Sequence, residues 1–93
     1  MRIPRSFQVM GLTYQVKLIP RESWKIEDAW AYVDFDTRVI SVMKRDKDAT
    51  EQSFLHEVIH VVFSSLGHNK LSKDERLVDT CASVLHQILT SAK

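Results

Sequence analysis

The sequence predicts one α+β domain, in which a small sheet of about four strands is followed by two packed helices. Two observations carry this prediction. Apolar residues alternate with a period of two up to about residue 43, and afterwards they recur with a helical period. The chain has 93 residues, 44% hydrophobic and 27% charged, without repeats or Gly/Ser linkers, which suits one compact domain over residues 1–93. We expect an antiparallel or mixed sheet.

The first two strands are predicted as a hairpin. Apolar residues at 7 and 9, and again at 14, 16 and 18, alternate with polar ones. Gly11 lies between the two runs and supplies the turn. Pro20 cannot donate to a sheet ladder, so the second strand should end before it.

Residues 21–30 are ambiguous and are predicted as one helical turn or a loop. Residues 31–43 then read as the third and fourth strands, which a polar turn near Asp36 and Thr37 connects. The β-branched residues of the last part favour a strand there.

The first helix is predicted to begin at Asp48, with Glu51 three residues later completing a capping box. Gly67 suits the left-handed residue that follows a helix. The second helix is predicted to begin at Ser72. One apolar face is expected along it, formed by Leu77, Val78, Cys81, Val84, Leu85, Ile88 and Leu89.

The charge balance argues against two classes of partner. Thirteen Lys and Arg and twelve Asp and Glu give a formal net charge of +1, and the basic residues are scattered among acidic ones. We therefore expect neither nucleic acid nor an anionic membrane as the partner. Cys81 is the single cysteine, so no intrachain disulfide is possible and a reducing, cytoplasmic location is expected. No secretory leader and no apolar run of about 18 residues is present, which predicts a soluble chain.

Residues 54–63 read "FLHEVIHVVF" and place His56, Glu57 and His60 in an apolar run. Residues four apart share a helix face, so the two imidazoles can bind one ion while Glu57 accepts a proton from water. Shuffling would produce this His-Glu-x-x-His spacing in roughly one such chain in 150. Buried polar groups need a partner, so a zinc site is favoured over histidines paired within the core.

Four segments resemble the small zincin-like metallopeptidases of bacteriophages and prophages, loosely related to the ImmA/IrrE group. They are "IPRSFQVMGLTYQVKLI", "TRVISV", "SFLHEVIHVVFSSLG" and "DERLVDTCASVLHQIL". The resemblance implies a minimal zincin-like fold, Zn²⁺ as cofactor, and hydrolysis of a protein or peptide substrate with Glu57 as general base. If the chain is phage-encoded, it implies the bacterial host cytoplasm.

The resemblance also implies a gluzincin-like ligand set of His56, His60 and Glu75, with Asp79 orienting a ligand histidine. Two alternatives stay open: Glu75 serves only as a capping residue after Ser72, or Asp79 is the third ligand. A metzincin site is excluded, because Leu66 occupies the position of its third histidine.

A substrate peptide is expected, again from the resemblance, to add to an edge strand formed by Val39, Ile40, Ser41 and Val42. His68 is interpreted as a solvated loop residue and His86 as a helix-surface residue. Tyr32 is a conceivable oxyanion donor, and no residue is assigned to that role. Two rival functions remain, a non-catalytic zinc-stabilised domain that binds a protein partner and a metal-free interaction module; Glu57 argues against the first. Oligomeric state is not predicted.

Overall fold

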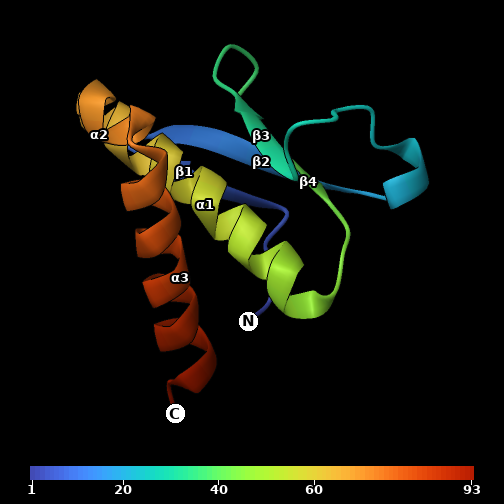
Figure 1. Cartoon of the computed structure of the whole chain (residues 1–93). Helices are drawn as coiled ribbons and strands as arrows, with labels where there is room; N and C mark the ends of the chain where they lie inside the picture. Colours follow the sequence, from blue (N-terminus) through green and yellow to red (C-terminus); the bar gives the residue numbers. More distant parts are fainter.

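Four strands form one mixed sheet in the computed structural model, which describes residues 1–93 (Figure 1). The strands are β1 (Ser6–Val9), β2 (Leu12–Ile19), β3 (Ala31–Asp34) and β4 (Val39–Met43). Their order is β1-β2-β4-β3, with β1–β2 and β3–β4 antiparallel and β2–β4 parallel. Helices follow the sheet, so the predicted α+β class is confirmed.

The N-terminal hairpin forms as predicted. Met10 and Gly11 connect β1 to β2 with φ of 52° and 79°, the two left-handed residues of a type I′ turn. Phe7 pairs with Tyr14 across the strands, and their rings stack 5.7 Å apart. β2 ends immediately before Pro20, and the ambiguous segment after it contains one 3₁₀ turn, Arg21–Ser23, followed by irregular chain.

β4 lies inside the sheet, between β2 and β3. Both sides of its backbone are therefore already paired, and the prediction that Val39, Ile40, Ser41 and Val42 form a peptide-binding edge is wrong. The free edges of the sheet belong to β1 and β3. Ile40 and Val42 are fully buried and Ser41 and Met43 nearly so. Such a continuously buried strand is typical of an interior position.

The capping residue of helix α1 (Lys47–Ser65) lies two residues before the predicted one. It is Asp46, whose carboxylate accepts a hydrogen bond from the Ala49 amide at 2.9 Å, rather than Asp48. Glu51 does not close a capping box, because it lies in the interior. The C-terminal end of α1 is as predicted. Gly67 has φ of 79°, and the amides of Gly67 and His68 donate hydrogen bonds back to carbonyls of the last helical turn, which completes a Schellman motif.

The chain after Gly67 forms two helices where one was predicted. A short helix, α2 (Asn69–Lys73), precedes α3 (Glu75–Ser91). Asp74 separates them in an extended conformation and caps α3 by accepting from the Leu77 amide at 3.1 Å. Ser72 therefore lies inside α2 and does not begin the long helix.

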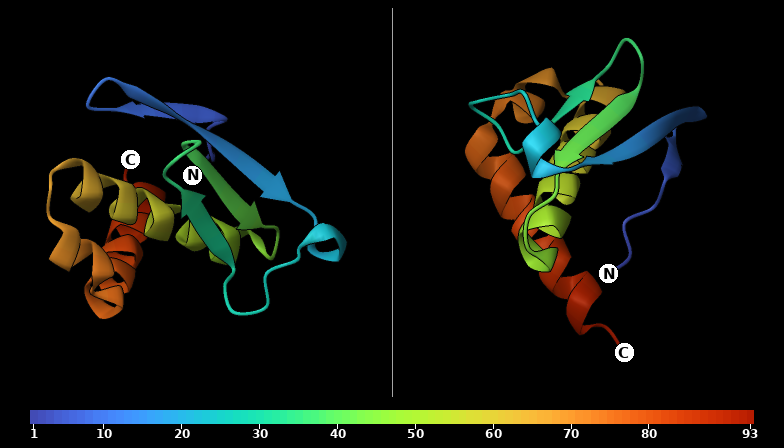
Figure 2. Two further views of the ribbon diagram at one scale, coloured as in Figure 1. Left: turned by 90° about the horizontal axis from the view of Figure 1, so that it is seen from above. Right: turned by 90° about the vertical axis from the view of Figure 1, so that its right-hand side faces the viewer.

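The secondary structure stacks as sheet, then α1, then α3 (Figure 2). α1 covers one face of the sheet and α3 packs mainly against α1. The core between these elements consists of Tyr14, Ala31, Ile40, Val42, Phe54, Leu55, Val61 and Ala82. Burial of each large apolar side chain contributes about 1.5–3 kcal/mol. No helix has the length and apolar character needed to cross a membrane.

The buried face of α3 differs from the predicted one. Val78, Ala82 and His86 are its buried residues, whereas Val84, Ile88 and Leu89 are each more than 40% exposed. The helix therefore packs along a line of residues spaced by four, with a histidine in the third position.

Candidate metal centre

Helix α1 presents His56 and His60 on one face, one helical turn apart. Their rings lie 4.9 Å apart, and both side chains are mostly buried. The start of α3 approaches this histidine pair, because Glu75 and Asp79 both contact His56.

Glu75 contacts both histidines. Its Oε2 lies 3.0 Å from Nε2 of His56, and its Oε1 lies 3.1 Å from Nε2 of His60. The short helix α2 and the cap at Asp74 bring Glu75, the first residue of α3, back over α1. Two nitrogens and a carboxylate from distant parts of the chain thus converge within 4.8 Å of one another.

The opposite nitrogen of each imidazole has its own partner. Asp79 places Oδ1 3.3 Å from Nδ1 of His56, and Ser72 places Oγ 3.2 Å from Nδ1 of His60. The Ser72 hydroxyl donates to the His60 carbonyl at 3.3 Å, so it is free to accept from Nδ1. With its proton on Nδ1, each ring turns a lone pair on Nε2 toward Glu75, and this is the tautomer that a metal ligand needs.

In this tautomer, the point between His56, His60 and Glu75 suits a cation. Nε2 of His56 and Nε2 of His60 lie 3.0 and 3.1 Å from the carboxylate oxygens of Glu75. Such contacts need a shared proton or a positive ion between them. Ligand atoms of a tetrahedral zinc site lie about 3.4 Å apart, given bonds of about 2.0–2.1 Å. The donor set and its spacing thus fit a zinc ion.

Glu57 is nearly buried beside this cluster, with 6% of its surface exposed. Burial raises its pKa to about 7; the charge of His56 opposes this rise and that of Glu75 adds to it. A carboxyl with a pKa near 7 can both accept and release a proton at neutral pH.

The positions of Glu75 and Asp79 distinguish between the two alternatives, that Glu75 only caps a helix and that Asp79 is the third ligand. The capping interpretation is wrong, because Asp74 caps α3 and Ser72 is not at the helix start. Asp79 contacts His56 on the Nδ1 side, away from the point where the Nε2 atoms converge. Glu75 is thus the carboxylate placed to share an ion with both histidines, and Asp79 is placed to orient His56.

A cavity of about 500 Å³ opens beside the cluster. His56, Glu57 and Glu75 line one part of it, and Trp30 and Arg45 line another. A pocket of this size can hold a few residues of a peptide.

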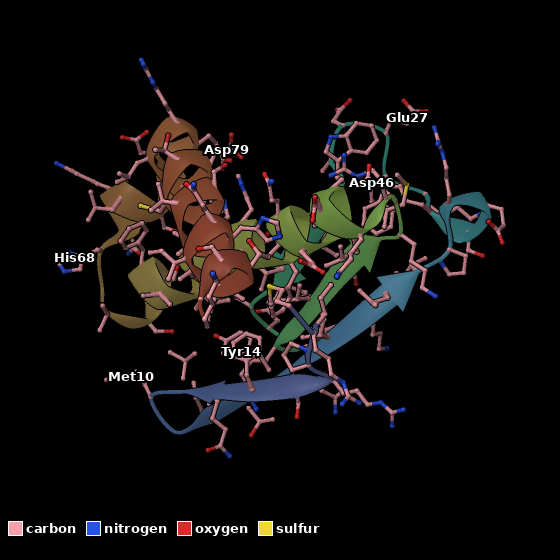
Figure 3. All side chains as sticks on the ribbon, turned by 90° about the horizontal axis from the view of Figure 1, so that it is seen from below. Met10, Tyr14, Glu27, Asp46, His68 and Asp79 are labelled. Carbon is pink, nitrogen blue, oxygen red and sulfur yellow. The ribbon has the colours of Figure 1, made fainter.

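Two side chains considered from the sequence lie elsewhere. His68 is exposed at the turn after α1 and points away from the body of the molecule (Figure 3). Tyr32 is 41% exposed on β3, packs against Trp24 at 5.8 Å, and does not line the cavity.

Sequence reasoning missed Ser72, which it treated as a cap, and misplaced His86. His86 is buried with 6% exposure, and its Nε2 lies 2.8 Å from Oε1 of Glu51. Asp48 approaches the same nitrogen at 3.9 Å. The spacing of four from Val78 and Ala82 was the available signal, because it places His86 on their buried line.

Comparisons with protein-family models, with curated proteins and with solved structures found no match to this chain. The interpretation of the cluster therefore depends on the chemistry of its own residues.

Proposed function

We propose that this protein is a zinc-dependent peptidase whose metal ligands are His56, His60 and Glu75. The observation that supports this most strongly is the pair of contacts at 3.0 and 3.1 Å between Glu75 and Nε2 of the two imidazoles. Two imidazole nitrogens and a carboxylate that converge on one point are a good donor set for a divalent ion.

A zinc ion held there supplies Lewis acidity, which polarises a substrate carbonyl and makes a water molecule easier to deprotonate. Glu57 acts as general base: its buried carboxylate takes the proton from the attacking water and then delivers it to the leaving amine. Asp79 and Ser72 hold the two imidazoles in the orientation that directs their lone pairs at one point.

We propose that the substrate peptide binds along strand β3. It is an edge strand, and Ala31 at its start lines the cavity together with Trp30. An extended peptide can therefore pair with its free backbone groups and reach the cluster through the cavity.

A purely structural zinc site is less compatible with these observations. Structural sites are closed by four protein ligands, whereas three converge here beside an open cavity. Burial of Glu57 also costs stability whenever its carboxyl is charged, and a structural site gains nothing from it.

The direct test is metal-dependent proteolysis by the full chain. The zinc-loaded protein is incubated with a diverse peptide mixture, and new termini are identified by mass spectrometry. Cleavage that a chelator abolishes and added zinc restores is expected. Tight zinc binding without cleavage of any peptide would contradict the peptidase and favour a non-catalytic zinc domain.

A further inference from the structure

Arg45 lies on the loop between β4 and α1 and lines the same cavity as His56 and Glu75. Its Nη2 donates to the hydroxyl of Ser53 at 2.6 Å and to the carbonyl of Ala49 at 3.3 Å. The guanidinium lies over the ring of Trp30, 4.7 Å from its centroid. Three neighbours from two segments thus fix the plane of this side chain.

None of these neighbours neutralises the charge. None of the ion pairs in the structure involves Arg45. Its Nε is buried without an acceptor, and its Nη1 donates to no protein group. Guanidinium groups that are removed from solvent normally form an ion pair with a carboxylate or a phosphate. The carboxylates that line the same cavity, those of Asp28, Glu57, Glu75 and Asp79, form no ion pair with Arg45. The guanidinium is therefore positioned for an anion that comes from outside.

The position of this cation relates it to the proposed chemistry. Ser53, which holds Nη2, lies on α1 one turn before Glu57. Arg45, His56 and Glu57 line the same cavity. A peptide group that contacts Arg45 is therefore only a few residues away, along the same peptide, from the bond that lies at the cluster.

We propose that Arg45 binds a carboxylate of the substrate, and that the preferred substrate is a peptide with an acidic side chain or a free C-terminus near the bond that is cleaved. As a statement about the substrate, this inference rests on the proposed peptidase function. Arginine suits the role because its planar fork can donate two hydrogen bonds to one carboxylate. The stacked Trp30 and the bonds of Nη2 hold that fork before the ligand arrives, which reduces the entropy lost on binding.

Three peptides of equal length distinguish the sources of the carboxylate. The first has an internal glutamate and an amidated C-terminus, the second replaces that glutamate by glutamine, and the third has the glutamine with a free C-terminus. Their affinities are measured by calorimetry for the zinc-free wild-type chain and for the zinc-loaded, Glu57→Gln chain, which does not consume them.

We expect one of the two carboxylate peptides to bind at least about tenfold more tightly than the neutral one, because hydrogen bonds to charged groups are the strong ones. Arg45→Met should remove this preference, and Arg45→Lys should retain only part of it. Arg5→Met is the matched control, since Arg5 is exposed and remote from the cavity. This variant should behave like wild type.

Equal binding of all three peptides, or a preference that survives Arg45→Met, overturns the proposal. If Arg45→Met does not fold, the proposal is tested by the binding preference of Arg45→Lys and by the effect of salt on the preference. A preference that Arg45→Lys leaves unchanged, and that about 0.5 M salt does not reduce, overturns it as well. Failure of the peptidase proposal looks different: zinc binding or cleavage is absent, while the Arg45-dependent preference persists in the zinc-free chain.

Discussion

Oγ of Ser72 lies 3.2 Å from Nδ1 of His60, and it reaches that nitrogen because α2 folds back beside α1. The same hydroxyl lies 3.1 Å from Ser64 and donates to the His60 carbonyl. One small side chain thus holds the orientation of an imidazole in the candidate metal centre.

Replacing this hydroxyl should weaken metal binding without removing it. Ser72→Ala leaves Nδ1 of His60 without its hydrogen-bond partner, and loss of such a partner typically costs 10–100-fold in metal affinity. Zinc affinity is measured by competition with a chelator, with Ser83→Ala as control because Ser83 is exposed on α3. Unchanged affinity in Ser72→Ala would show that the contact does not orient a ligand.

Glu57→Gln should separate catalysis from metal binding. The amide has nearly the same shape but cannot accept a proton, so we expect zinc content to be kept and cleavage to fall by about 10²–10⁴-fold. Metal analysis and a peptide-cleavage assay on the same sample measure the two properties. Loss of zinc in this variant would mean that Glu57 is a ligand, and undiminished cleavage would remove it from the mechanism.

The zinc-free protein should lose stability as the pH rises from about 4.5 to 7. Burial raises the pKa of Glu57 to about 7 in the folded chain, from 4.5 as its ordinary value. In this window the folded state binds the proton and the unfolded state has lost it, so stability falls, by on the order of 3 kcal/mol in total. Urea unfolding of wild type and Glu57→Gln at pH 5 and pH 8 isolates this contribution. An equal pH dependence in both chains contradicts it.

Glu51 should produce the opposite pH dependence. Burial alone raises its pKa, but hydrogen bonds from His86 and the N-terminal ammonium, with the charges of that ammonium and Lys47, outweigh burial and hold the pKa below 4.5. Its stabilisation is therefore present above pH 4.5 and disappears as the pH falls through the lowered pKa.

Glu51→Gln tests this contribution, since it leaves buried His86 with a weaker partner. It should destabilise the chain by about 1–3 kcal/mol near pH 7. The difference in melting temperature from wild type should shrink on acidification. Glu22→Gln, at an exposed position, is the control. A difference that persists at low pH would argue that Glu51 acts through packing rather than charge.

Much of the fold could be predicted because it depends on local patterns. Alternation at residues 7–18, the turn glycine at Gly11 and the helix-ending Gly67 each act within a few residues, and each appears where the sequence indicates. Strand order is a non-local property. The placement of β4 inside the sheet follows from pairing with β2, although the nearly continuous apolar run "VISVM" was a usable signal.

The errors at helix starts have a common physical origin. Both Asp46 and Asp48 can cap α1, and both Ser72 and Asp74 can precede a helix, so capping preference alone does not choose between them. Tertiary contacts select the capping residue. When the helix starts at Asp46, the hydroxyl of Thr50 accepts a hydrogen bond from the Arg45 amide at 2.9 Å. The break at Asp74 frees Ser72 to contact His60. Such choices depend on neighbours that are distant in sequence.

The central claim, that His56, His60 and Glu75 bind one zinc ion, is tested most directly by chelator competition on the purified chain and its variants. We expect about one zinc per wild-type chain, no tight binding by His56→Ala or His60→Ala, and a far larger loss of affinity in Glu75→Gln than in Asp79→Asn, which removes only a partner of Nδ1. Zinc should also raise the melting temperature of wild type, because ligand binding to the folded state stabilises it. Full zinc affinity in His56→Ala or His60→Ala would contradict the account, and loss in Asp79→Asn with retention in Glu75→Gln would replace the third ligand.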